Sequence, residues 1–298
     1  MFNVFLIILE KLLTAFLVIL PQKFALYLGA RFGGSFLFLV KFTRYHNYMT
    51  NNVKITFGKK FNERERCQIV KSSIEKMCKS LVEVFRFPIL NKENLRKKVQ
   101  FVGIEHLDTA LAQNRGVILV TAHFGNWELL GVSLSLTGHS LATVIQVQSN
   151  PVANNFLNHR RESKGIKVIS RYVDLRVLVK LLKQNYVFGM LVDQHGESKK
   201  VFGTFFGHKV SLPEGPAVLS VLVGSPIIPV FIIRNPDDTH CIIIEPPLNL
   251  ESLKEQDRDK KIAIISQMVS DVLEKYISLY PDHWNWMYNR WDKLKSEK

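Results

Sequence analysis

The sequence predicts an α/β fold with a mostly parallel central sheet flanked by helices, preceded by a membrane-associated helix at the N-terminus. Two observations predict the sheet. Short apolar runs alternate with amphipathic stretches between residues 99 and 250, as in βαβ units. Several of these runs are unbroken, which is typical of parallel strands buried on both faces. The apolar character of residues 1–20 predicts the N-terminal helix.

The first 45 residues differ in composition from the rest, so we expect an anchor region over 1–45 and a main domain over 46–298. The run MFNVFLIILEKLLTAFLVIL has no basic start and no small-residue cleavage site after it, which argues against a signal peptide. Glu10-Lys11 interrupts it, so a clean 20-residue span is absent. Basic residues follow this run and would mark the cytoplasmic side of such an anchor: Lys23, Arg31, Lys41 and Arg44. We expect a membrane-embedded or interfacial helical anchor; the alternative is a buried helix of the globular core.

The charge balance restricts the partners. The chain has 40 Lys and Arg against 26 Asp and Glu, a net charge of +14, which suits an anionic bilayer, a phosphorylated substrate or nucleic acid. Nucleic acid is disfavoured because no recognition motif or zinc spacing is present. The three cysteines are too few and too scattered for a disulfide framework.

The elements follow one another in a regular order. Asn62 is a cap for a helix with apolar residues at helical spacing, which Pro88 ends. Between this helix and the C-terminus we expect strands over 99–102, 117–120, 141–146, 166–169, 187–192, 225–234 and 240–245. We expect helices over 105–113, 127–134, 152–164, 175–183, 217–223 and 262–279.

Two segments do not fit this alternation. Residues 201–209 are rich in Phe and Gly, which suits a loop that touches an apolar ligand. Residues 281–291 hold three of the four tryptophans, a cluster that suits either a membrane interface or closure of the core.

The chemistry is predicted in GVILVTAHFGNWELL, residues 116–130. An apolar strand ends just before His123, at the edge where open α/β sheets usually bind ligands. Gly125 allows a sharp turn, and Glu128 falls in the first turn of the next helix. A carboxylate there can hold one imidazole nitrogen while the other takes a proton from a bound hydroxyl. The alternative is a structural histidine beside an ordinary first-turn acid.

The HFGNWE motif resembles the His-x4-Asp/Glu signature of glycerolipid acyltransferases, in the form used by the lipid A secondary (lauroyl/myristoyl) acyltransferases of the lysophospholipid acyltransferase-like superfamily. Further matches lie in the same order along the chain: Arg161 four residues before Gly165, LVDQ at 191–194, FFG at 205–207, the segment 215–234 and a Pro-Asp-x-Trp-x-Trp tail. One departure is Ile145-Gln146-Val147, where the family has Tyr-Arg-Pro, and it puts phosphate recognition at that point in doubt.

This resemblance implies transfer of a fatty acyl group from acyl carrier protein (or coenzyme A) to a hydroxyl of an anionic lipid A precursor. Residues 46–298 would be the acyltransferase domain, facing the cytoplasm at the inner membrane. His123 would be the general base and Glu128 would orient it. The acyl thioester would be a co-substrate, so we expect no cofactor and no metal.

The resemblance also implies substrate-binding residues. Arg161 would bind a phosphate or steady the oxyanion, while Asp193 and Gln194 would line the cleft. Lys209 and Arg234 are weaker phosphate candidates, and Phe205 and Phe206 would bound an acyl groove. Each has a plainer alternative: a surface arginine, a turn after a strand, a solvated charge or core packing.

Two other functions stay open. One is acylation of another membrane acceptor, a lysophospholipid or a glycosylated phosphoinositide. The other is a non-catalytic basic protein of the membrane surface.

Overall fold

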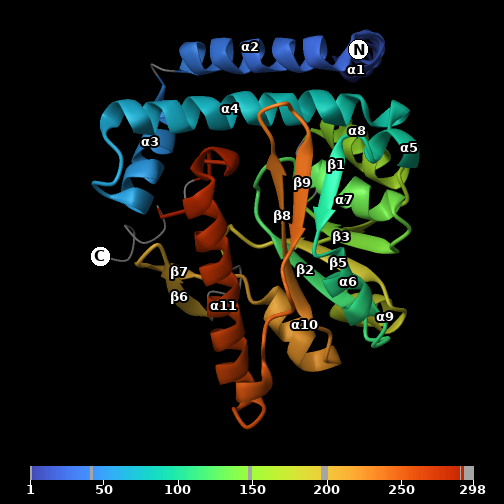
Figure 1. Ribbon diagram of the computed structural model, residues 1–298, viewed down its shortest axis with the longest axis vertical. Coiled ribbons are helices and arrows are strands. Elements are labelled where there is room, and N and C mark those ends of the chain that lie inside the picture. Colours follow the sequence, from blue (N-terminus) through green and yellow to red (C-terminus); the bar gives the residue numbers. More distant parts are fainter. Residues whose placement is uncertain (1, 41–42, 147–149, 196–200, 289, 292–298) are drawn as a thin grey trace.

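The computed structural model describes residues 2–40, 43–146, 150–195, 201–288 and 290–291. Within them, seven strands form one sheet in the order β1-β9-β8-β2-β5-β3-β4 (Figure 1). Every neighbouring pair is parallel except β8 and β9. The predicted, mostly parallel α/β sheet is therefore confirmed. The strands are β1 (Val99–Val102), β2 (Val117–Thr121), β3 (Leu141–Ile145), β4 (Lys167–Ser170), β5 (Val187–Leu191), β8 (Ile227–Arg234) and β9 (His240–Ile244).

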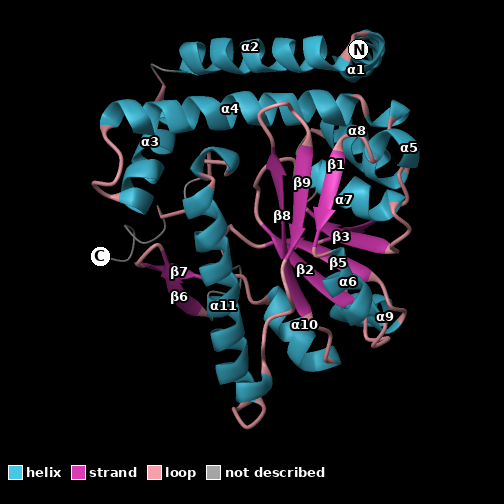
Figure 2. Ribbon diagram, viewed as in Figure 1, coloured by secondary structure: helices cyan, strands magenta, loops and turns pink. Residues whose placement is uncertain are grey.

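Helices cover both faces of this sheet (Figure 2). Strand β2 buries its apolar residues on both faces: Val117 and Leu119 lie in one core with α6 and α7, and Ile118 and Val120 lie in a second core with α10 and α11. This two-sided burial is the physical reason for its unbroken apolar run. The helices of the main body are α3 (Arg44–Phe57), α4 (Glu63–Phe85), α5 (Lys92–Leu95), α6 (Ile104–Leu111), α7 (Trp127–Leu136), α8 (Pro151–Glu162), α9 (Leu175–Lys183), α10 (Gly215–Val223) and α11 (Arg258–Leu279).

Residues 201–211 form a hairpin where a loop was expected. Strands β6 (Phe202–Phe205) and β7 (His208–Ser211) pair antiparallel and stand beside α11, apart from the main sheet (Figure 1). Phe206 and Gly207 make the turn, both with positive φ. Glycines and aromatic residues at 201–209 suit a loop as well as a short hairpin, so the sequence did not distinguish the two.

The N-terminal helices α1 (Phe2–Ile19) and α2 (Gln22–Val40) lie along one end of the molecule, with α2 against α4 (Figure 1). Gly29 and Gly33 lie inside α2 and face α4. A Cβ atom at Gly33 would lie 3.1 Å from the Cα of Glu75, so the absence of a side chain permits the close approach.

No helix among the described residues is long and apolar enough to cross a membrane. The expectation of a membrane-embedded anchor is therefore not supported.

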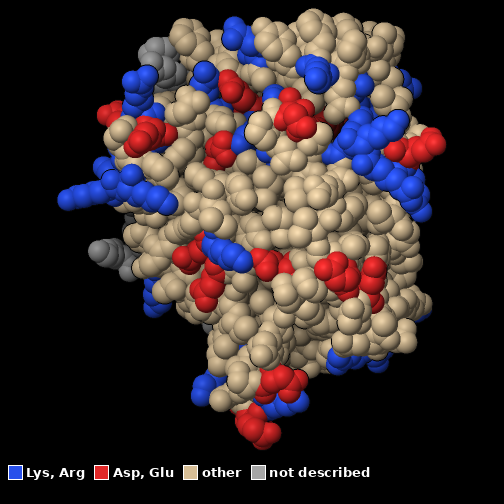
Figure 3. Space-filling view, viewed as in Figure 1, with Lys and Arg blue, Asp and Glu red and all other residues tan. Residues whose placement is uncertain are grey.

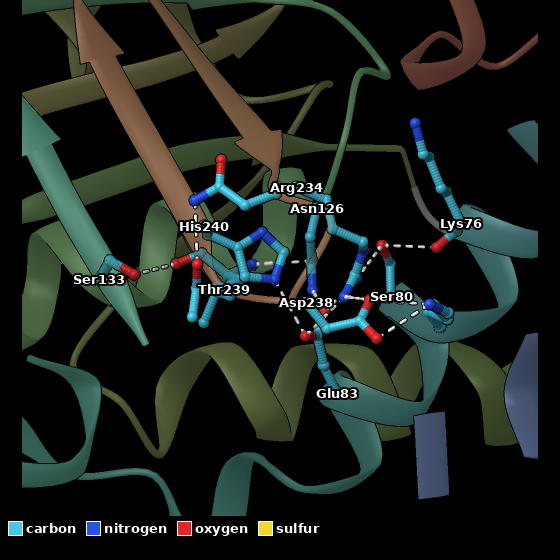
Figure 4. Close-up of polar contacts among 12 residues, drawn as sticks. Lys76, Ser80, Glu83, Asn126, Ser133, Arg234, Asp238, Thr239 and His240 are labelled. Carbon is cyan, nitrogen blue, oxygen red and sulfur yellow. Dashed lines mark hydrogen bonds and ion pairs between the residues drawn. The ribbon is translucent and has the colours of Figure 1, made fainter. Parts of the chain in front are cut away.

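A buried carboxylate on α4 ties the β8–β9 hairpin to the turn after β2 (Figure 4). Glu83 accepts hydrogen bonds from Arg234 (Nη1 at 3.0 Å, Nη2 at 2.5 Å), from His240 Nε2 at 2.9 Å and from Asn126 Nδ2 at 2.7 Å. Burial would raise the pKa of Glu83, but the charges and hydrogen bonds of His240 and Arg234 lower it to about 2. Glu83 is thus an ionised anchor inside the protein.

This network corrects one sequence-based expectation and explains a turn. Arg234 was a candidate for phosphate contact, but its side chain is 3% exposed and is committed to Glu83. Asn126 uses its other end, Oδ1, to accept from Leu129 N–H and so caps α7. The residue that caps α7 is therefore fixed to α4, which holds the preceding HFG turn in place.

We predict that Glu83→Gln lowers the free energy of unfolding by about 3 kcal/mol, because the buried Arg234 guanidinium loses its bidentate counter-charge and keeps only Asp238, at 3.4 Å. The folded pKa of about 2 lies below the ordinary value of 4.5. The carboxylate's contribution is therefore present above pH 4.5 and is lost as pH falls towards 2. Urea denaturation of both proteins across this range measures the difference.

Glu75→Gln is the matched control on the same helix. Its partner Lys71 is half-exposed at 3.8 Å, so we expect a loss below about 1 kcal/mol. Equal losses for the two variants would contradict an anchoring role for Glu83.

Candidate active site

His123 and Asp193 meet because they follow neighbouring strands. In the parallel pairing of β2 with β5, Thr121 lies opposite Leu191, and each site residue comes two positions later. His123 Nδ1 lies 2.8 Å from Asp193 Oδ1, and the backbone N–H of His123 donates to Oδ2 at 3.0 Å. The sequence analysis predicted that Asp193 lines the cleft of His123, and the structure brings the two together.

The turn that carries His123 is held by the C-terminal segment. Gly125 has φ +58°, and a Cβ atom there would lie 2.1 Å from the carbonyl oxygen of Ile232, so the turn requires glycine. The Gly125 N–H donates to the carbonyl of His283 at 2.8 Å, and the Asn285 N–H donates to that of His123 at 2.9 Å. These bonds make a short antiparallel pairing between the turn that carries His123 and the C-terminal segment.

Trp284, in that same segment, contributes a side chain to the site. Its indole Nε1 donates to Asp193 Oδ2 at 2.8 Å. The three described tryptophans of the tail, Trp284, Trp286 and Trp291, are all buried, so the cluster closes the core rather than facing a membrane. The link from Trp284 to Asp193 was missed because nothing near either residue in the sequence indicates it.

These bonds fix the protonation of the pair. Burial would raise the pKa of Asp193, but the charge of His123 and the hydrogen bonds from His123 and Trp284 lower it. An ionised carboxylate only accepts, so Nδ1 of His123 carries a proton and Nε2 of the neutral ring has the lone pair. The His123 side chain is 23% exposed, and Nε2 has no hydrogen-bond partner within the described part of the chain. The free nitrogen is thus available to a bound hydroxyl.

The pKa of His123 is raised above its ordinary 6.5. Burial lowers it, but the charge and hydrogen bond of Asp193 and the charge of Glu128 outweigh that effect. The ring is therefore a stronger base than a free histidine. The Trp127 ring lies edge-on to the imidazole of His123, with ring centroids 5.2 Å apart, and covers one side of it.

Glu128 has a different partner from the one expected. The sequence analysis gave it the role of holding an imidazole nitrogen, but Asp193 occupies Nδ1, and Glu128 pairs with Arg161. The pair is bidentate, from Arg161 Nε to Oε2 at 2.8 Å and from Nη2 to Oε1 at 2.5 Å. Spacing alone placed Glu128 near His123, which its effect on the pKa supports, but could not reveal the arginine that its oxygens face.

The other predicted site residues are dispersed. Gln194 is half-buried directly after Asp193. Lys209 is exposed on β7, with its ammonium 5.4 Å from the Phe202 ring centroid. Phe205 is 1% exposed and packs against Trp284, so its ring belongs to the core. Phe206 is half-buried and packs on Phe57. Of the departure at 145–147, Val147 lies outside the described residues.

The arrangement suits acid–base chemistry on a hydroxyl, with His123 as base and Asp193 fixing its tautomer. Among the described residues, no group of three or more His, Cys, Asp or Glu side chains could hold a metal ion.

Known proteins show a clear similarity to this chain. Residues 1–293 match the model of a family described as bacterial lipid A biosynthesis acyltransferase. The phosphatidylinositol mannoside acyltransferase of Mycobacterium tuberculosis (strain H37Rv) is 27% identical over 235 residues, which cover 74% of this chain and 69% of that protein. The lipid A biosynthesis acyltransferase of Haemophilus influenzae is 22% identical over 290 residues, with coverage of 90% and 87%. The lipid A biosynthesis myristoyltransferase of Escherichia coli K12 is 24% identical over 238 residues, with coverage of 79% and 72%.

We predict that Asp193→Asn lowers the pKa of His123 by about 1–3 pH units, because it removes the nearest negative charge. An NMR titration of the His123 Cε1–H signal, assigned with His123→Ala, measures the shift. Asp108→Asn is the matched control: Asp108 lies 3.0 Å from His139 but is 62% exposed, so its removal leaves His123 unaffected. An unchanged His123 titration in Asp193→Asn would contradict the dyad.

Proposed function

Since this chain belongs to the bacterial lipid A biosynthesis acyltransferase family and is an acyltransferase, we propose that it transfers a fatty acyl chain from acyl carrier protein to a hydroxyl of a lipid A precursor. The reaction takes place at the cytoplasmic face of the inner membrane. The observation that carries the proposal is the free Nε2 of His123, with Nδ1 held by Asp193 at 2.8 Å.

The proposed step is direct attack by the acceptor. Nε2 of His123 takes the proton of the acceptor hydroxyl while its oxygen forms a bond to the thioester carbonyl carbon. Collapse of the tetrahedral intermediate breaks the carbon–sulfur bond, and the imidazolium gives its proton to the leaving thiolate. Asp193 stabilises the imidazolium throughout, so no acyl-enzyme is needed.

Glu128 and Arg161 take supporting roles in this proposal. The negative charge of Glu128 favours the imidazolium of His123. Arg161 uses its Nε and Nη2 groups to hold Glu128, so we assign it to positioning that carboxylate rather than to binding a phosphate directly. Its Nη1 donates to Asn158 at 3.2 Å on the same helix.

A second acceptor is favoured by one comparison. The mycobacterial relatives that match over about three-quarters of this chain are named phosphatidylinositol mannoside acyltransferases. The alternative function is therefore acylation of a glycosylated phosphoinositide with the same dyad.

The N-terminal helices support docking on a membrane surface. Helix α1 exposes a broad apolar face to the outside, formed by Val4, Phe5, Ile7, Ile8, Leu9, Leu12, Leu13, Phe16 and Ile19. Helix α2 adds Phe24, Tyr27, Phe32, Phe38 and Leu39. In Figure 3 this edge is mostly uncharged, and a cluster of basic residues lies beside it over α5. Lys92, Arg96 and Lys97 are exposed there and suit anionic headgroups. We assign the α1–α2 edge to the bilayer interface.

We predict that purified wild-type protein acylates a lipid A precursor from acyl carrier protein thioester, at a rate that rises with pH through the raised pKa of His123, above 6.5. The rate rises because only the neutral ring accepts a proton. His123→Ala should lower it by about 10²–10⁴-fold. Mass spectrometry of products from a panel that includes acyl-coenzyme A and a phosphatidylinositol mannoside measures both. If only the phosphatidylinositol mannoside is acylated, the lipid A precursor is rejected as the acceptor and the glycosylated phosphoinositide takes its place.

We predict that Leu12→Ser weakens binding to vesicles that contain anionic phospholipid by about 10-fold or more, because a fully buried leucine contributes about 1.5–3 kcal/mol. Leu12 is 64% exposed. Leu222→Ser is the matched control, since that leucine is 53% exposed on α10, away from the proposed interface. Equal losses in vesicle co-sedimentation would contradict docking through α1.

A further inference from the structure

Two consecutive arginines on α8 contact two different helices. Arg160 Nη2 donates to Glu10 Oε1 and to Thr14 Oγ1 on α1, both at 2.9 Å. Arg161, the next residue, holds Glu128 on α7 beside His123. The residue that contacts α1 and the residue that contacts Glu128 beside His123 are thus adjacent in the same helix.

The Glu10–Arg160 pair is shielded from water. The two side chains are 21% and 11% exposed, and Thr14 donates a further hydrogen bond to Glu10 at 2.9 Å. The Arg160 guanidinium lies 5.0 Å from the centroid of the Phe156 ring, which packs on Phe85 of α4. A shielded pair of this kind fixes geometry, because loss of one partner leaves the other charge partly buried and unpaired.

Helix α1 has the reverse of the usual amphipathic pattern. Its inward face carries Leu6, Glu10, Thr14 and Leu17 at helical spacing, and its outward face is mostly apolar, with Asn3 and Lys11 as its exposed polar residues. Of the inward residues only Leu17 is fully buried, in a small core with Leu26 and Val82. Glu10 and Thr14 therefore provide the polar contacts that hold the middle of α1 against α8.

We propose that Arg160 is a positioning residue that makes the placement of α1 part of the active-site geometry, through α8 and the Arg161–Glu128 pair. This inference rests on the proposed function, in which the outer face of α1 lies on the bilayer. When α1 packs against α8, Glu10 holds Arg160 in place. Helix α8 is then positioned so that Arg161 makes both of its hydrogen bonds to Glu128. When the contact with Glu10 is lost, α8 is free to shift, and the two parallel hydrogen bonds to Glu128 are the contacts most sensitive to that shift.

The consequence reaches His123 through charge. Asp193 and Glu128 are the acidic groups that raise its pKa, and Arg161 neutralises Glu128. Glu128 is held in the first turn of α7 by the backbone, so it keeps its place when Arg161 withdraws. Its charge then acts on the imidazole without compensation.

The test is Glu10→Gln, which keeps the size of the side chain and removes the charge that Arg160 faces. We expect a higher pKa for His123 by NMR titration in vesicle-bound full-length protein. We also expect kcat/KM for the acceptor to fall by roughly 2- to 30-fold, the range of coupling through packed elements. The exchanged pair Glu10→Arg with Arg160→Glu restores both towards wild type. Glu162→Gln, the same substitution at an exposed site on α8, changes neither.

The outcomes separate the two proposals. An unchanged His123 titration in Glu10→Gln, or an exchanged pair no better than its single variants, overturns the positioning role. A fall in thermal stability of Glu10→Gln without movement of the titration also overturns it, because it shows a purely structural contact. If wild-type protein acylates no acceptor, the proposed function fails, and the titration alone still decides the role of Arg160.

Discussion

The hydrogen bond between His123 Nδ1 and Asp193 is the interaction on which the site depends, and it is set by strand pairing rather than by sequence proximity. Strands β2 and β5 are parallel neighbours, so the residues that follow each of them lie at the same edge of the sheet. The two residues that follow Thr121 and Leu191 therefore meet, 70 positions apart. Around this contact the C-terminal segment adds the Trp284 indole and two backbone bonds, so the last part of the described chain completes a site begun at β2.

Two buried carboxylates, Glu83 and Asp193, each hold an imidazole at a similar distance, and the surroundings of the two pairs separate their roles. Glu83 and His240 are 2.9 Å apart, and the ring is 1% exposed with an arginine and an asparagine on the same carboxylate. Asp193 and His123 are 2.8 Å apart, but the ring is 23% exposed. Burial makes the first pair an anchor, because Arg234, His240 and Asn126 all donate to Glu83 inside the core. The open nitrogen of the second pair suits the general base that we propose. The Glu83 pair also supports the position of His123, because Asn126 joins Glu83 to the turn that carries His123.

Local sequence predicted what local forces determine. The apolar run of β2, the capping of α4 by Asn62 and the strand ends that carry His123 and Asp193 could all be predicted, because burial and capping act over a few residues. Strand order could not, since β2 lies beside β5 only after the whole sheet assembles. For the same reason spacing selected Glu128 as the partner of His123. The true partner depends on a contact across the sheet, and the true partner of Glu128 lies on α8.

The N-terminal segment was predicted to be a membrane-embedded or interfacial anchor, and the embedded form is the part that the described helices do not support. Hydropathy counts side chains without regard to direction, and Glu10 was treated as an interruption of an apolar run. In the folded protein Glu10 is on the inward face of α1, paired with Arg160, and the apolar residues face out. A helix built this way needs no span to meet a bilayer, because its single acid is satisfied by the protein body. The charge that weakens α1 as a membrane span is therefore the one that fastens it beside the active site.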